Sequence, residues 1–393
     1  MKAGVPATIA EHFGSLEDPR VERTKHHQLL DILIIAICAV VCGADDWVAV
    51  ESFGQARREW LETFLPLEGG IPSHDTFGRV FARLNPDAFR ACFRSWIQAV
   101  FTQTRGQVVA LDGKTLRRSH DNARGKAAIH MVSAWATENT LVLGQLKVED
   151  KSNEITALPA LLRLLSLEGC IVTIDAMGCQ TAIAQEILDA RAEYVLALKE
   201  NQGTLYQDVV LAFHEGRHTG FRDIAHDTHQ TTDGDHGRLE IRRCWVIRDP
   251  EYLRYFAREE HWPGLRSVAM VESECWEGDA VRRERRYFIS SLPGEAHVLA
   301  HGIRSHWGIE NSLHWVLDMS YREDESRVRV GNAPENLAVL RHLTLNLLTQ
   351  ETSLKVAAFT VTENLGASGD YYYLYCVAPQ KQAEEVLPYR MEG

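Results

Sequence analysis

Two acidic residues each follow a short apolar segment of this 393-residue chain. Asp112 ends the stretch QVVALD and Asp175 ends the stretch CIVTID, and both stretches have the composition of buried strands. Taken singly, Asp112 with Gly113 is a common turn pair, and Asp175 is suited to cap the helix that follows it. If the two strands are neighbours in one sheet, both carboxylates lie at one edge and offer the oxygen ligands of a magnesium or manganese site.

A third carboxylate is needed if two divalent ions are to activate an attacking oxygen and stabilise a leaving one in phosphodiester chemistry. Glu310, in the helical stretch SHWGIENSLHW, is the first candidate. His306 lies four residues before it and His314 four residues after it, so one helical face presents all three side chains. The residues alone leave the third acid open, because four more acids follow closely: Asp318, Glu323, Asp324 and Glu325.

Basic residues lie close to these acids in the sequence. Lys114, Arg117 and Arg118 follow Asp112, and two later runs read RLEIRR from residue 238 and RRERR from residue 282. Lysine and arginine contacts to phosphate dominate the affinity of proteins for DNA, so these runs are candidate DNA contacts. The two later runs are equally typical of solvated strand edges that are protected from aggregation.

Two aromatic residues and three histidines in the later region raise further alternatives. Trp245 and Trp276 are suited to stacking on an extruded DNA base, although core packing explains them as well. The stretch HDTHQTTDGDHGR from residue 226 lacks cysteine and has the polarity of a loop, so we expect no zinc site there. The eight cysteines include no C-x-x-C pair, which favours reduced thiols.

Length and composition set the broad class. A chain of 393 residues favours two or three domains. The net charge of -12 is a caution against a nucleic-acid partner, but binding depends on local patches and not on the sum. The longest apolar run, residues 29–43, contains Asp31 and is about five residues shorter than a membrane span. Since no secretory signal is recognisable, we expect a cytoplasmic protein without a membrane partner.

The patterns along the chain divide it into a helical part and a mixed part. The first hundred residues predict helices at 29–43, 45–65, after Ser73 as N-cap, and 85–101, which suits a helix-turn-helix reader or any small helical bundle. From residue 107 the patterns predict an α/β fold, because non-alternating apolar strands are typical of sheets covered on both faces by helices. The predicted strands are 107–112, a hairpin over 127–149, 170–176 and 193–199; residues 220–291 predict antiparallel β-structure.

Five motifs carry a resemblance to a known family: ALDGKTLRRS, TIDAMGCQ, ALKENQ, HGRLEIR and RSHWGIENSLHWVLDMSYRED. Together they are similar to the DDE transposases of bacterial insertion sequences, and most similar to the subgroup with the H-repeat-associated proteins, over residues 13–350. The resemblance implies a ribonuclease-H-like catalytic domain with Asp112, Asp175 and Glu310 as catalytic and metal-binding acids. The long interval between the second and third acids matches the β-rich insertion that such transposases carry.

The same resemblance implies an all-α N-terminal domain over 1–104, a catalytic domain over 105–350 with its insertion at about 220–291, and a tail over 351–393. It implies an endonuclease that cleaves DNA at insertion-sequence ends and transfers the strand into target DNA, with magnesium or manganese as cofactor. The partners would be double-stranded DNA and a second copy of the chain, associated with the nucleoid. The implied DNA-binding residues are Lys114, Arg117, Arg118, Lys199, Asn201, Arg238, Trp245 and His306.

The chain also departs from the family pattern. Related transposases often carry a tyrosine and an arginine before the glutamate and a lysine seven positions after it, where this chain has Ile303, His306 and Leu317. The tail after residue 355 lacks the basic segment that family members tend to have. Two alternatives therefore stay open: a DNA-binding relic whose catalysis has decayed, and a nuclease of the same fold that cuts without joining.

Overall fold

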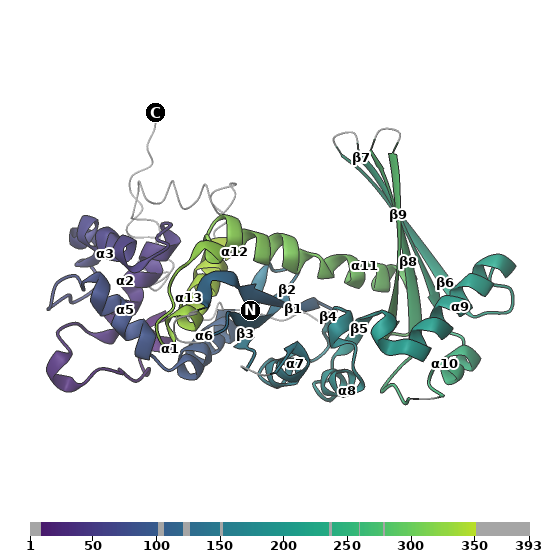
Figure 1. Ribbon diagram of the computed structural model, residues 1–393, viewed down its shortest axis with the longest axis horizontal. Coiled ribbons are helices and arrows are strands. Elements are labelled where there is room, and N and C mark those ends of the chain that lie inside the picture. Colours follow the sequence, from purple (N-terminus) through teal and green to yellow (C-terminus); the bar gives the residue numbers. More distant parts are fainter. Residues whose placement is uncertain are drawn as a thin grey trace, which may run out of the picture.

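A computed structural model describes residues 9–100, 106–120, 126–149, 152–235, 238–258, 260–277 and 280–350. The molecule is elongated, with helices at one end, a sheet in the middle and a long β-ribbon that projects from the other end (Figure 1). The predicted tail over 351–393 and the predicted domain boundary at 104 lie outside the described residues.

The N-terminal region is built around one apolar helix, α2, whose residues from Asp31 to Val41 are all buried. The predicted helix over 45–65 is divided in two, because the backbone leaves helical geometry at Arg57 (φ −112°, ψ 19°). Ser73 precedes α5 as expected, but its hydroxyl contacts the Thr76 hydroxyl (3.2 Å) and makes no cap to a backbone amide. The helices are α1 Ile9–Phe13, a 3-10 turn Glu22–Thr24, α2 Leu29–Val41, α3 Trp47–Ala56, α4 Arg58–Leu61, α5 His74–Arg83 and α6 Pro86–Val100.

A nine-stranded mixed sheet forms the rest of the framework, in the order β3-β2-β1-β4-β5-β9-β8-β7-β6. Strands β1, β4 and β5 are mutually parallel, whereas β2, β3 and the later strands run antiparallel to their neighbours. The strands are β1 Val108–Leu116, β2 Ile129–Ala136, β3 Leu141–Lys147, β4 Ile171–Ile174, β5 Glu193–Leu198, β6 His226–Asp235, β7 Arg238–Ile247, β8 Ser267–Glu277 and β9 Ala280–Ser290.

Helices cover both faces of the parallel strands, as the non-alternating apolar segments predict (Figure 1). Val109 and Leu111 of β1 pack in the core below the sheet, while Val108 packs in the core on the opposite face. The covering helices are α7 Glu154–Arg163 and α8 Thr181–Asp189 on one face and α11 Ala296–His306 on the other, with α9 Gly203–Thr219 and α10 Pro250–Phe256 beside the base of the ribbon.

The first strand does not end at its acid, which corrects the turn predicted at Asp112 and Gly113. Pairing of β1 with parallel β4 ends at Leu111, but pairing with β2 continues to Leu116. Gly113 is therefore a strand residue. A Cβ atom there would lie 2.1 Å from Glu154 Oε1 and 2.5 Å from His130 Nε2. Only glycine fits at this position, because the hydrogen-bonded side chains of His130 and Glu154 (2.5 Å apart) occupy the space that a Cβ atom would fill.

Replacing Gly113 with alanine should therefore destabilise the protein by about 1–3 kcal/mol, the usual cost of overpacking. The methyl group would displace the Glu154 carboxylate and the His130 ring, and so disturb β1 beside Asp112. Chemical unfolding followed by circular dichroism measures this loss. Gly144→Ala on β3 is the matched control, since its Cβ would meet only side-chain carbons at 3.1 Å or more; an equal loss in both variants would contradict the explanation.

Strands β6 to β9 form the predicted antiparallel region as a long twisted ribbon (Figure 1). Residues 226–235 of the histidine-rich stretch, whose polarity suggested a loop, form strand β6, because polar side chains need no core on this solvated ribbon; His236 lies outside the described residues. Cross-strand ion pairs stabilise the ribbon, and most of the described arginines of the two basic runs take part. The pairs include Arg285–Glu272 (2.5 Å), Arg283–Glu274 (3.2 Å), Arg243–Glu274 (3.2 Å) and Arg242–Asp233 (2.6 Å).

The C-terminal helices join the two ends of the molecule. Helix α13 is buried along almost its whole length and shares one core with the N-terminal helices and the edge of the sheet. The N-terminal helices are thus not packed as an isolated unit. The remaining elements are a π-helical turn η6 Ile309–His314, α12 Trp315–Met319, a 3-10 turn η7 Glu323–Glu325 and α13 Ala333–Gln350. Within the described ranges, no helix combines the length and hydropathy of a membrane span.

Candidate metal centre

Asp112 and Asp175 are brought close to one another by the neighbouring parallel strands β1 and β4. Leu111 of β1 is paired with Ile174 of β4, so Asp112 and Asp175 are the next residues on each strand. Buried apolar residues precede both acids, which fixes their backbone positions. The prediction that the two strands are neighbours in one sheet is therefore confirmed, and their parallel register places the two acids close together.

Asp175 has a local structural role at the same time. Its carboxylate accepts hydrogen bonds from the backbone amides of Met177 (3.0 Å) and Gly178 (3.4 Å) and caps a 3-10 turn, Ala176–Gly178. The sequence suggested a cap for the following helix, but one carboxylate oxygen of Asp175 caps this 3-10 turn instead, and Gln180 stands at the N-cap position of α8. The other oxygen accepts no hydrogen bond from the described residues, so a capped Asp175 still has ligand capacity.

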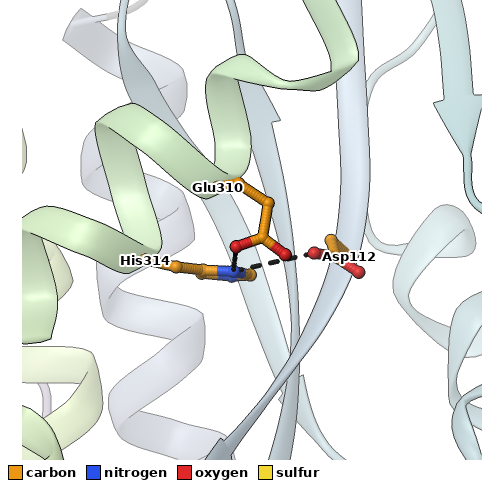
Figure 2. A group of neighbouring side chains, drawn as sticks. All are labelled: Asp112, Glu310 and His314. Atoms are coloured by element: carbon orange, nitrogen blue, oxygen red, sulfur yellow. Dashed lines mark ion pairs between the residues drawn. The ribbon is translucent and has the colours of Figure 1, made fainter. Parts of the chain in front are cut away.

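Glu310 and His314 leave the same helical turn and point toward Asp112 (Figure 2). Single ligand atoms of these three side chains lie within 4.8 Å of one another. His314 Nδ1 is 3.6 Å from Asp112 Oδ2 and 3.7 Å from Glu310 Oε2. The His314 side chain is only 7% exposed, whereas that of Glu310 is 56% exposed. Two carboxylates and one imidazole thus converge at the edge of the sheet, and Asp175 is outside this closest group.

The pKa of Asp112 shows how crowded the acids are. The pKa of Asp112 is raised to about 8, chiefly by burial and also by the nearby carboxylates of Glu310, Asp175 and Glu154, although one hydrogen bond from the Gly113 amide acts in the opposite direction. A carboxyl that resists ionisation among other acids is well suited to a cation, because a positive charge relieves both the repulsion and the burial cost. The donor set of two carboxylates and an imidazole fits a divalent metal ion.

His314 faces the acids as a neutral ring. Burial lowers the pKa of His314, although the carboxylate of Glu310 acts in the opposite direction. A neutral imidazole has a free lone pair on one nitrogen, which is the form that binds metals. The other ring nitrogen, Nε2, is buried and has no hydrogen-bond partner among the described residues.

The four other acids that the sequence offered as a third ligand form ion pairs with basic side chains. Asp318, Glu323 and Asp324 lie around the Lys114 ammonium, at 2.5 Å, 3.6 Å and 3.5 Å. Glu325 pairs with Arg322 on the surface. Of these candidates it is therefore Glu310 that lies beside Asp112.

The three cations after Asp112 differ in accessibility. The Lys114 side chain is 11% exposed and held by its three acids, while Arg117 is 79% exposed and lies 3.1 Å from Asp324. Arg118 is exposed, and its carbonyl accepts a hydrogen bond from Arg329 Nε (2.9 Å). The two arginines therefore offer more charge to a phosphate than Lys114 does.

The other predicted DNA contacts are spread over three places. Lys199 is exposed after β5, and nearby Asn201 donates a hydrogen bond to the Ala176 carbonyl (2.7 Å), which supports the turn after Asp175. Two more lie on the ribbon. Arg238 lies near Glu240 (3.9 Å) and Glu277 (3.8 Å), and the ring of half-buried Trp245 lies 5.3 Å from the guanidinium of Arg217. The last, His306, is on α11, and its Nδ1 contacts the Thr173 hydroxyl (3.0 Å).

Sequence reasoning did not assign His314 to the site. Its signal was the four-residue spacing from Glu310, which predicts a shared helical face but not that the face turns toward Asp112. The family departures also have a structural explanation: Ile303 and Leu317 are both buried and pack in the core. A charged lysine at the second of these positions would be buried there.

Comparison with family models matches almost the whole described chain. A model described as "Transposase DDE domain" matches residues 103–347, and one described as "DDE_Tnp_1-associated" matches residues 10–97.

Several relatives agree with these matches. "Putative transposase YncI" of Escherichia coli O157:H7 is 42% identical over 357 residues, which covers 88% of this chain and 89% of that protein. "H repeat-associated putative transposase YhhI" of Escherichia coli (strain K12) is 39% identical over 352 residues, 88% of this chain and 92% of that protein. An uncharacterized protein from the dhlA 3' region of Xanthobacter autotrophicus is 46% identical over 288 residues, 71% of this chain and 92% of that protein. The chain therefore belongs to the DDE transposase family.

Proposed function

We propose that this transposase cuts phosphodiester bonds at the ends of an insertion sequence and joins the freed 3′-hydroxyl to target DNA. The observation that carries the proposal is the convergence of Asp112 and Glu310 at a sheet edge whose next strand ends on Asp175. Such chemistry needs closely placed carboxylates that hold divalent cations. The strand order β3-β2-β1-β4-β5, with β1, β4 and β5 parallel, supports a ribonuclease-H-like catalytic domain.

Each acid has a defined part in this proposal. Asp112, Asp175 and Glu310 would hold magnesium or manganese, which when bound would activate the attacking oxygen and stabilise the leaving one. The buried strands hold the two aspartates rigidly, and the exposed Glu310 carboxylate sits on the face that DNA would approach. Because the Asp112 carboxyl resists ionisation without a cation, metal binding at this site would release a proton.

The proposal is tested with purified full-length protein, magnesium, and labelled duplexes that carry the inverted repeats flanking the coding sequence. We expect strand cleavage at the repeat end, with joined products when a second duplex serves as target. A duplex with a pre-cut 3′-hydroxyl end should also be joined. Cleavage without joining would indicate a nuclease, and binding without cleavage would indicate a decayed relic; a gene without flanking repeats would contradict the proposal.

Arg118 should contribute to phosphate binding. Replacing Arg118 with alanine should weaken DNA binding equally for specific and unrelated duplexes and reduce the slope of log affinity against log salt by about one. Mobility-shift titrations at several salt concentrations measure the slope. Arg191→Ala is the control with the same charge change, since Arg191 pairs with Glu168 at the opposite edge of the sheet, before β5. Equal slopes for Arg118→Ala and the wild type would contradict this contact.

A further inference from the structure

We propose that the His314 imidazole is a direct ligand of the divalent ion held by Asp112 and Glu310. The inference rests on the proposed function and makes the centre a mixed oxygen and nitrogen site. The ligand chemistry expected from carboxylates alone suits magnesium, whereas an imidazole adds affinity for manganese and later transition metals.

The distances around His314 suit a shared ion better than direct contact. Its Nδ1 lies 3.6 Å from Asp112 Oδ2 and 3.7 Å from Glu310 Oε2, which is beyond a good N–H···O hydrogen bond. Two ligand atoms that each lie about 2.1 Å from one metal ion are separated by roughly 3–4 Å, depending on the angle at the ion. Both separations therefore match atoms arranged around a common centre.

The local backbone explains how helical residues four apart reach the same point. Residues from Ile309 to His314 form a π-helical turn, in which the Trp315 amide donates to the Glu310 carbonyl five residues earlier. Such widened turns are rare and often mark functional sites. The flanking side chains Ile309 and Leu313 are fully buried, so the turn is anchored in the core while Glu310 and His314 face Asp112 (Figure 2).

Burial makes a purely structural role for His314 costly. The side chain is 7% exposed; its Nδ1 has only the two long contacts to Asp112 (3.6 Å) and Glu310 (3.7 Å), and its buried Nε2 has no hydrogen-bond partner among the described residues. A buried polar atom without a hydrogen-bond partner lowers the free energy of unfolding by about 1–3 kcal/mol. An apolar side chain at this position would avoid this loss. A metal ion bound by Nδ1 would give that nitrogen a close partner in place of its two long contacts.

The experiment uses Mn²⁺ as the probe, because its unpaired electrons report on directly bound nitrogen. Full-length protein is loaded with one equivalent of Mn²⁺ and examined by pulsed electron paramagnetic resonance. We expect modulation from a coordinated ¹⁴N nucleus, which should disappear when the histidines are labelled with ¹⁵N. This labelling leaves the protein chemically unchanged, so the test does not depend on the folding of a variant.

Variants then identify the histidine. His314→Ala should still bind Mn²⁺ through the carboxylates, at least ~10-fold more weakly, and should lack the nitrogen modulation. His314→Gln serves the same purpose if the alanine variant does not fold. His306→Ala is the matched control from the same helical segment, because the His306 ring contacts Thr173 and not the carboxylates of the closest group; its modulation should persist.

The outcomes separate this inference from the proposed function. Mn²⁺ that binds in an Asp112-dependent way but shows no histidine nitrogen would overturn the role of His314 and leave the carboxylate centre intact. Modulation that is lost in His306→Ala and kept in His314→Ala would overturn it as well. Mn²⁺ binding that is unchanged in Asp112→Asn would contradict the metal centre itself, and with it both proposals.

Discussion

Replacing Asp112 with asparagine should abolish cleavage of element-end DNA, with a rate loss on the order of 10³-fold or more. The substitution preserves shape but removes one of the two charges that converge with His314. A bound metal ion contributes several kcal/mol of transition-state stabilisation, and each 1.4 kcal/mol is a factor of ten in rate. Cleavage of a labelled duplex in magnesium measures the loss, and mobility shifts in the absence of magnesium should show nearly unchanged DNA binding.

The stability of the same variant provides an internal control. Folding raises the pKa of Asp112 from 3.8 to about 8 in the metal-free protein, chiefly through burial. The folded state therefore holds this proton more tightly than the unfolded state, and the resulting stabilisation is lost progressively as pH rises from 3.8, the unfolded-state pKa, to about 8, the folded-state pKa. Asparagine does not titrate, so metal-free wild type should lose stability relative to the variant over this range. A folded variant that cuts at the normal rate would contradict the assignment.

Replacing Glu323 with alanine should destabilise the protein by about 3–5 kcal/mol, which is the usual result of leaving a buried charge without its partner. The Glu323 carboxylate lies between Arg341 Nη1 (3.5 Å) and Lys114 Nζ (3.6 Å), and all three side chains are largely buried. Arg341 Nη2 already has no hydrogen-bond partner in the described structure, so its guanidinium would keep no close carboxylate. The shift in the midpoint of chemical unfolding measures this effect.

Glu325→Ala is the matched control for that measurement. Glu325 lies in the same 3-10 turn and also pairs with an arginine, Arg322, but both side chains are more than half exposed. Exposed pairs of this kind contribute roughly 0–1 kcal/mol. Similar losses in both variants would contradict the explanation, because burial is the difference between them. Since Lys114 is two residues after Asp112 on β1, the Glu323 variant should also impair cleavage.

Much of the candidate site could be predicted from short-range patterns. The apolar stretches that end on Asp112 and Asp175 predict strands that are buried on both faces. Such strands can be recognised from their own residues, because they are apolar without alternation. Parallel neighbours then place both acids at one edge without further information. The position of Glu310 between two histidines likewise reflects helical spacing, which is a local property.

Other features depend on residues that are far apart in the chain, and no local pattern contains them. Lys114 lies two residues after Asp112 and was predicted to contact phosphate, yet its ammonium pairs with Asp318, which lies 204 positions later. The dipeptide Asp112-Gly113 is typical of a turn, but pairing with β2 keeps Gly113 in a strand. The His130–Glu154 pair fills the space beside it.

The sequence by itself determined the acids, the apolar segments that lead to them, and the helix that carries Glu310, since each depends on hydrophobic periodicity within one segment. Only the tertiary structure decided which further side chains join the centre. His314 lies beside Asp112 because a π-helical turn is anchored in the core against β1, and Lys114 is paired with three acids that are distant in the sequence. Packing and charge pairing between distant segments, not local spacing, settle the composition of the site.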